Sequence, residues 1–268
     1  MDRQTQTAAR QLFAAVQTLD LRLPKQVEAA RGQLDAVRLA VENIPPHDRE
    51  GVARAVADAL IEGADPLTDP GVARAIQHAA ITQPSTLDGV ETSALMRLWE
   101  AVNEHSDEMV DAMRKPFDKA AEVLVAAHEQ IGDLDLKADS EAILKKGGGI
   151  ASAYTGAVEA SEAINAVTLA WSMLDNLAGT SQVDPRWVAL RITNPQAGKF
   201  DELELERKSL APYEAVRLGL PLSLPTLPEY TQRRAAITEY RAQVARNQEQ
   251  ARRDQSHNFH NLSMQRIR

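Results

Sequence analysis

Apolar residues recur every three or four positions along residues 92–134, and this spacing keeps one stripe on one side of an α-helix. We therefore expect a long amphipathic helix that begins near a capping hydroxyl at Thr92 or Ser93. The pattern is interrupted at His105, and Pro116 lies within it between Met113 and Phe117. Because proline removes a helix hydrogen bond and crowds the preceding turn, we expect a kink or break near Ala112. The apolar positions are Leu95, Leu98, Val102, Met109, Met113, Phe117, Ala120, Leu124, Ala127, Ile131 and Leu134.

The same spacing predicts helices on both sides of this one. Residues 27–44 carry a short seam of the coiled-coil kind, which suits either a helical hairpin within the chain or a short intermolecular seam. A second long helix, over residues 150–178, should pack antiparallel on the first. The predicted helices cover residues 4–23, 24–44, 48–62, 69–81, 92–131, 141–146, 150–178, 201–210 and 229–254.

Two of the short helices begin with a similar sequence. The string Gly-Val-Ala-Arg-Ala-Val at residues 51–56 returns as Gly-Val-Ala-Arg-Ala-Ile at residues 71–76. An offset of this size is typical of a duplicated helical unit, although two copies of six residues in an alanine-rich chain also arise by chance.

Prolines prevent any long regular element in residues 179–230. Within this arm, the residues around Trp187 suit either one short strand or an irregular segment that Trp187 holds down. Residues 221–228 predict an extended, semi-rigid connector. Its apolar side chains should dock on a surface, either of a neighbouring subunit or of the chain's own body. The docking residues are Leu222, Leu224, Leu227 and Tyr230.

These patterns together predict an all-α protein. We expect an elongated antiparallel helical bundle with an acidic surface over residues 1–178. A proline-rich arm should follow over residues 179–230, and a basic C-terminal helix and tail over residues 231–268.

Charge is distributed unevenly along the chain. The net charge is −8, but residues 231–268 hold eight arginines and three acidic residues, so this segment is +5 and the rest is −13. An acidic body with a basic terminus suggests two different partners, or one molecule contacting another head to tail. The candidate partner-binding residues are Arg233, Arg234, Arg241, Arg246, Arg252 and Arg253.

Composition argues against catalysis and against a bound cofactor. The chain has no cysteine, which excludes disulfides and thiolate ligands, and aromatic residues make up only 4% of it. Gly147-Gly148-Gly149 lacks the lysine and hydroxyl of a phosphate-binding loop, so we interpret it as a hinge. His105 lies three residues before Glu108, but no Glu-x-x-His motif of a helical metal site occurs. We therefore expect no enzyme, no metal, no cofactor and no small-molecule substrate.

No basic-then-apolar stretch opens the sequence, and its most apolar window, residues 163–174, is too short to span a bilayer. We expect a cytoplasmic protein or a component of an assembled particle, with no membrane contact. The favoured function is that of a structural or assembly protein, of the scaffolding, adaptor or virion type, acting through helix packing and homo-oligomerisation. The alternative is a nucleic-acid-associated accessory protein that binds phosphates through the arginine-rich tail.

Overall fold

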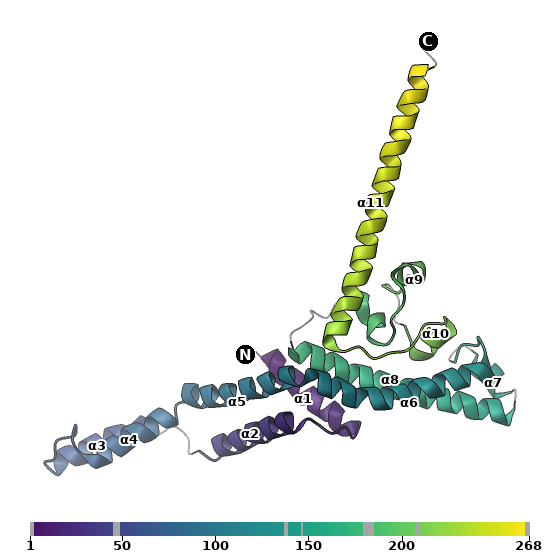
Figure 1. The fold of residues 1–268 in the computed structure, drawn as a ribbon. Coiled ribbons are helices and arrows are strands. Elements are labelled where there is room, and N and C mark those ends of the chain that lie inside the picture. The colour runs from purple at the N-terminus through teal and green to yellow at the C-terminus, as the bar shows by residue number, and fades with distance from the viewer. Residues whose placement is uncertain are drawn as a thin grey trace. The chain divides into compact units, whose positions relative to one another are not determined.

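The computed structural model is all-α, which confirms the predicted fold class (Figure 1). Within the described residues no strand forms, and the one extended pairing is an isolated bridge between Thr193 and Leu222. The structure describes residues 3–44, 49–136, 139–145, 147–178, 185–206 and 210–265. It describes the backbone alone at residues 3–6, 49, 144, 185 and 254–265.

The chain divides into two compact units. Unit 1 consists of Met1–Arg10 and Arg22–His105, and unit 2 consists of Gln11–Leu21 and Ser106–Arg268. Helix α1 (Arg3–Thr18) therefore contributes to both units.

Unit 1 contains two helix pairs, in which α2 packs against α5 and α3 packs against α4. In the first pair Leu34 and Leu98 are buried, and Arg38 Nε donates to Glu91 Oε1 at 2.8 Å. The apolar seam of residues 27–44 thus pairs within the chain rather than remaining open. The helices of this unit are α2 (Lys25–Glu42), α3 (Arg49–Ile61), α4 (Pro70–Ile81) and α5 (Pro84–Glu104).

Helix α4 starts where its sequence predicted. The carboxylate of Asp69 accepts hydrogen bonds from the N–H groups of Gly71 at 2.7 Å and Val72 at 3.0 Å. Pro70 occupies the first helical position, where its missing N–H costs nothing. Residue 48, where the helix preceding α4 was predicted to begin, lies outside the described residues.

The long helix predicted over residues 92–131 is in fact two helices, and the predicted break near Ala112 is wrong. Helix α5 already begins at Pro84 and ends at Glu104, and α6 (Ser106–Ile131) starts after His105. Asp107 and Glu108 favour a helix start here because acidic side chains stabilise the first turn.

Helix α6 continues through Pro116, which costs one backbone hydrogen bond. Its neighbours on the apolar stripe, Met113 and Phe117, are buried as predicted, and their packing offsets that loss.

Unit 2 is built on the pairing of α6 with α8 (Gly148–Ala178). Both helices contribute buried side chains, among them Phe117 and Leu124 of α6 and Ile164 and Trp171 of α8. The remaining elements of this unit are α7 (Ser140–Leu144), the 3₁₀ helix η1 (Pro185–Arg191), α9 (Ala197–Glu202), α10 (Pro212–Arg217) and α11 (Leu227–Gln265).

Two further predictions need correction. The helix expected over residues 201–210 is instead α9, because the chain turns at Glu204, whose φ of 53° is left-handed. The glycine run is not a hinge of three residues, since α8 already begins at Gly148. Only Gly147, with a φ of 109°, adopts a conformation that requires glycine.

Among the described residues, no helix has an apolar stretch long enough to cross a bilayer.

Candidate interaction surfaces

Residues 221–226 form the extended connector within the proline-rich arm. Backbone hydrogen bonds hold this connector to the rest of unit 2. The indole Nε1 of Trp171 donates to the carbonyl of Pro225 at 2.7 Å, and Thr193 Oγ1 donates to the carbonyl of Pro221 at 2.7 Å. The N–H of Ser223 donates to the carbonyl of Ile192 at 2.9 Å. These bonds satisfy an extended backbone that would otherwise need water or a partner strand.

The predicted docking residues of the arm face the chain's own unit. Leu224, Leu227 and Tyr230 are buried, and Leu222 is half-buried beside Thr193. The sequence left two surfaces open for these residues, that of a neighbouring subunit and that of the chain's own body. In the structure they contact the body of the same chain. Trp187 is buried in a 3₁₀ helix, as the irregular-segment alternative requires, and no strand forms around it among the described residues.

A reciprocal cap fixes the start of α11. Thr226 Oγ1 accepts from the N–H of Glu229 at 3.2 Å, and Glu229 Oε2 accepts from the N–H of Thr226 at 2.7 Å. Glu229 Oε2 also pairs with Arg114 Nη2 of α6 at 2.8 Å. The pKa of Glu229 is lowered, chiefly because its carboxylate accepts the hydrogen bond from the Thr226 backbone. Partial burial acts in the opposite direction, and the positive charges of Arg114 and Arg233 lower the pKa further. Thr226-x-x-Glu229 is a capping-box signature and was visible in the sequence.

The cap predicts a pH-dependent contribution to stability. A folded-state pKa below the ordinary value of 4.5 means that this contribution is present above that pH and is lost as the pH falls further. We expect Glu229→Gln to lower the free energy of unfolding at pH 7 by about 1 kcal/mol or less, since the ion pair is exposed. The difference from wild type should shrink as the pH falls from 4.5 through the lowered pKa of Glu229, in urea titrations at several pH values. A difference that does not change with pH would mean that the glutamate acts by packing alone.

Arg233, the first of the candidate partner-binding arginines, is bound within unit 2. Its Nη1 donates to the carbonyls of Leu190, Thr193 and Ser223 at 2.9, 3.0 and 3.2 Å, and its Nη2 donates to Ser223 Oγ at 2.8 Å. Burial lowers the pKa of this guanidinium. Arg233 thus joins η1, the arm and α11 at one point.

Arg234 and Arg241 lie over the indole of Trp187, at 5.9 and 5.7 Å from its ring. Arg241 also donates to Asp201 Oδ1 from Nε at 2.9 Å and from Nη2 at 2.6 Å, and to Glu206 Oε2 from Nη2 at 2.7 Å. The bond to Asp201 raises the pKa of Arg241 further. Three of the six candidate arginines therefore support the fold.

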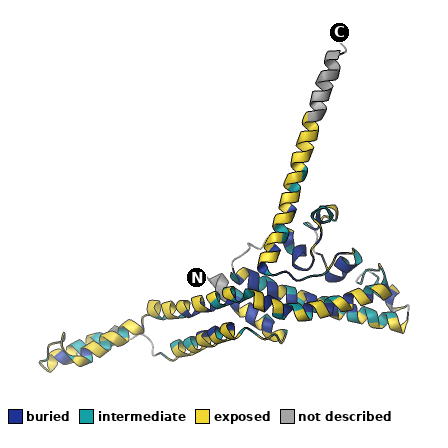
Figure 2. Ribbon diagram, viewed as in Figure 1, coloured by how far each residue is buried: buried dark blue, intermediate teal, exposed yellow. Residues whose placement is uncertain are grey.

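The other three arginines lie on the distal part of α11. Arg246 donates to Gln243 Oε1 at 2.7 Å, Arg253 pairs with Glu249 one turn away, and Arg252 is exposed. Every described side chain from residue 245 to residue 253 is exposed, whereas the first turns of α11 are partly buried (Figure 2). These arginines are the ones that a phosphate or an acidic surface can reach.

A second exposed surface lies on α3 and α4 in unit 1. Helix packing between them buries Ala59 and Val72, yet several large apolar side chains point to solvent. The side chains that are more than half exposed are Leu60, Ile61, Leu67, Ile76 and Ile81. Exposed apolar side chains of this size on a small helical hairpin are typical of an interaction surface.

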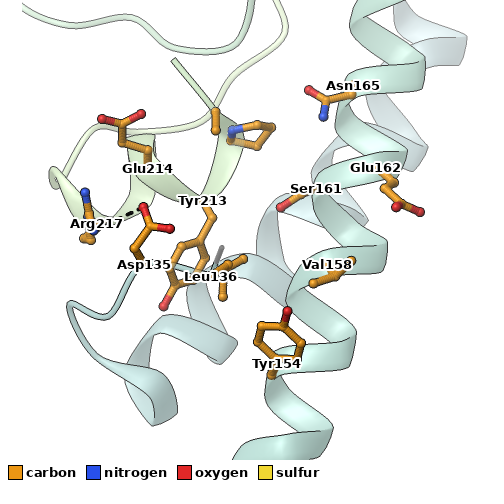
Figure 3. A pocket seen from close by; sticks show the side chains of 12 residues that line it. Asp135, Leu136, Tyr154, Val158, Ser161, Glu162, Asn165, Tyr213, Glu214 and Arg217 are labelled. Carbon is orange, nitrogen blue, oxygen red and sulfur yellow. Dashed lines mark ion pairs between the residues drawn. The ribbon is translucent and has the colours of Figure 1, made fainter. Parts of the chain in front are cut away.

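Unit 2 also contains an open pocket of about 580 Å³ between α8, α10 and the loop after α6 (Figure 3). Tyr213 donates to the carbonyl of Gly132 at 3.0 Å, and burial raises its pKa, so it stays a protonated donor. Ser161 donates to the carbonyl of Ala157 at 2.8 Å, which leaves its hydroxyl without a base. The pocket is lined by Asp135, Leu136, Tyr154, Val158, Ser161, Glu162, Asn165, Ala211, Pro212, Tyr213, Glu214 and Arg217.

The charged groups of this pocket are three carboxylates and one guanidinium, and Asp135 lies 3.7 Å from Arg217. Such a lining suits polar contacts but pairs no nucleophile with a general base. In the part of the chain that the structure describes, no three histidine or acidic side chains gather closely enough to hold a metal ion. Comparison of the chain with protein-family models, curated proteins and solved structures finds no match.

Proposed function

We propose that this chain is a non-enzymatic structural or assembly protein that works through helix packing and self-association, in the cytoplasm or within an assembled particle. The observation that carries the proposal is the exposure of α11. The helix has 39 residues, so it is about 58 Å long. Its packing partners include η1 and α9, whereas the described side chains of residues 245–253 are exposed.

The distal part of α11 has little to stabilise it as an isolated helix. Most stability of protein helices comes from tertiary packing of an apolar face, and isolated helices are marginal in water. Between residues 242 and 253 the largest apolar side chain is Val244. A partner that covers this part of the helix would supply the missing packing.

The second candidate function is nucleic-acid binding through Arg246, Arg252 and Arg253, which their exposure on one helix favours. Against it stands the acidic remainder of the chain, which repels a phosphate backbone. An acidic surface on another copy of the protein attracts the same three arginines. The charge of the chain itself therefore supports self-association.

The test compares solution mass and nucleic-acid affinity in wild type and in Arg252→Ala plus Arg253→Ala. We expect wild type to self-associate, the double variant to associate about tenfold more weakly, and neither to bind DNA or RNA tightly at physiological salt. Arg22→Ala plus Arg97→Ala, which removes two exposed arginines from unit 1, is the matched control and should leave the mass unchanged.

Nucleic-acid binding makes the opposite prediction. Affinity for DNA or RNA would then fall tenfold or more between low and moderate salt, and equally for every nucleic-acid sequence. Tight binding of this kind, lost in the double variant but not in the control, would replace self-association with nucleic-acid binding as the function.

A further inference from the structure

The repeated six-residue string makes α3 and α4 two similar helices of one hairpin, residues 49–81. The helices pack against each other and run in opposite directions from the loop that joins them (Figure 1). Two similar antiparallel helices are related by a two-fold axis perpendicular to the plane that contains them. Residues at matching positions, such as Ala53 and Ala73, therefore lie on the same side of that plane, and both are exposed.

One side of this hairpin is apolar. At about 100° per residue, its residues lie between about 40° and 100° around their helix from Val52 or Val72, in the same direction in both helices. Leu60 and Ile76 are the large side chains of this side, 62% and 52% exposed. The exposed residues of this apolar side are Ala53 and Leu60 of α3 and Ala73, Ile76 and Ala80 of α4.

Ionisable side chains lie on the other side of the hairpin. They are found between about 120° and 160° from the same two valines, in the opposite direction around each helix. A partner bound to the apolar side does not meet these groups. A second copy of the hairpin can therefore lie there without bringing like charges together. The side chains concerned are Arg54 and Asp58 of α3 and Arg74 and His78 of α4, all exposed.

The hairpin has little core of its own. Among the described side chains of residues 50–81, only Ala59 and Val72 are buried. A unit of fewer than about 40 residues seldom buries enough apolar surface by itself. Because most of the stability of protein helices comes from packing an apolar face, a second hairpin on the apolar side would supply the missing layer.

Side-chain size along the apolar side suits a two-fold contact. Leu60 lies toward the loop end of the hairpin, Ala53 and Ala80 lie toward its open end, and Ile76 lies near the middle of α4. In a second hairpin turned end for end, Leu60 of each copy lies over the alanines of the other, and the two Ile76 side chains meet near the axis. Large side chains then oppose small ones, as in a packed core.

We propose that the apolar side of the α3–α4 hairpin binds the same side of the hairpin from a second copy of the chain. The product is a four-helix bundle with its two-fold axis near Ile76. The contact is isologous, so it closes as a dimer. This inference rests on the proposed self-association, and it adds a contact that does not involve the arginines of distal α11.

The first test places charge in this contact in the full-length protein. Leu60→Glu plus Ile76→Glu brings four carboxylates together across the two-fold axis, so self-association should weaken at least about tenfold in sedimentation velocity. Both side chains are more than half exposed in a single copy, so the circular dichroism spectrum should match wild type. Leu60→Met plus Ile76→Met keeps the side apolar and should associate as wild type does.

The matched control uses two other exposed isoleucines of the same helices. Ile61 and Ile81 are 83% and 57% exposed, and each lies about half a turn from Val52 or Val72, on the outer surface of the hairpin. Ile61→Glu plus Ile81→Glu should leave self-association unchanged. An equal loss in this control would mean that exposed apolar area in general, rather than the apolar side, drives association, and it would overturn the pairing.

A second test locates the axis. The chain has no cysteine, so a single introduced thiol can form a disulfide only with its own counterpart in another copy. Under mild oxidation Ile76→Cys should give a covalent dimer on a non-reducing gel, because the two thiols meet near the axis. Ile81→Cys, at a comparably exposed position of the same helix, should stay monomeric. Equal cross-linking of the two variants, or none in Ile76→Cys, contradicts the two-fold pairing.

The outcomes separate this pairing from the proposed function. Association that survives Leu60→Glu plus Ile76→Glu but weakens in Arg252→Ala plus Arg253→Ala overturns the pairing and leaves self-association intact. A wild-type protein that remains monomeric at high concentration overturns the proposed function and the pairing with it.

Discussion

Leu124→Asp is expected to lower the free energy of unfolding of unit 2 by about 3–5 kcal/mol. Leu124 is 0% exposed in the packing of α6 against α8. An aspartate there loses the apolar contacts of the leucine and places an unpaired charge in a site that water does not reach. This is the largest single effect we predict for a substitution in the chain.

The control for this substitution is its neighbour Val125, which is 48% exposed. Val125→Asp should change the free energy of unfolding by no more than about 0.5 kcal/mol. Tryptophan fluorescence during urea unfolding reports mainly on unit 2, because Trp171 and Trp187 lie there and are buried, while Trp99 belongs to unit 1. Equal midpoints for the two variants would mean that the stripe of α6 is not a core.

The stripe of α6 was predictable because helix periodicity is local information. An apolar residue at every third or fourth position specifies a buried face wherever the neighbouring helix lies, and Met109, Phe117 and Leu124 are all buried. The break at His105 was not predictable from that pattern. The stripe keeps its period across the break, so only the polar run from His105 to Glu108 marks the place where α6 begins.

Short elements were predicted poorly for a different reason. Helix α10 has six residues and was not predicted, and α9 was placed too late in the chain. Helices of this length have almost no intrinsic stability, so packing against distant residues decides where they form. Tyr213 of α10, for example, donates to the carbonyl of Gly132, which is 81 residues earlier.

The roles of the arginines could not be separated by counting charges. Arg233 and Arg246 belong to the same basic segment, yet one binds three backbone carbonyls and the other is exposed. Those carbonyls come from η1 and the arm, segments with no regular pattern of their own. The composition of residues 231–268 predicted a basic helix correctly but left its division into a packed first part and an exposed distal part undetermined.

That division leads to the second large prediction. Arg233→Ala should destabilise unit 2 by about 2–4 kcal/mol, because it removes charged hydrogen bonds and leaves the carbonyls of Leu190, Thr193 and Ser223 with fewer donors. Arg246→Ala should change stability by no more than about 0.5 kcal/mol, since its one described contact is an exposed bond to Gln243. Urea unfolding of the two variants under the same conditions measures both values.

The comparison also separates the two uses of arginine in this segment. If Arg233 serves the fold, Arg233→Lys should recover only part of the lost stability, because an ammonium lacks the planar geometry that reaches several acceptors at once. In that case Arg233→Ala should weaken self-association only as far as it unfolds unit 2. Arg246→Ala should show the reverse, with unchanged stability and weaker self-association. Equal stabilities for the two alanine variants would mean that Arg233, like Arg246, contributes little to the fold and is free to bind a partner.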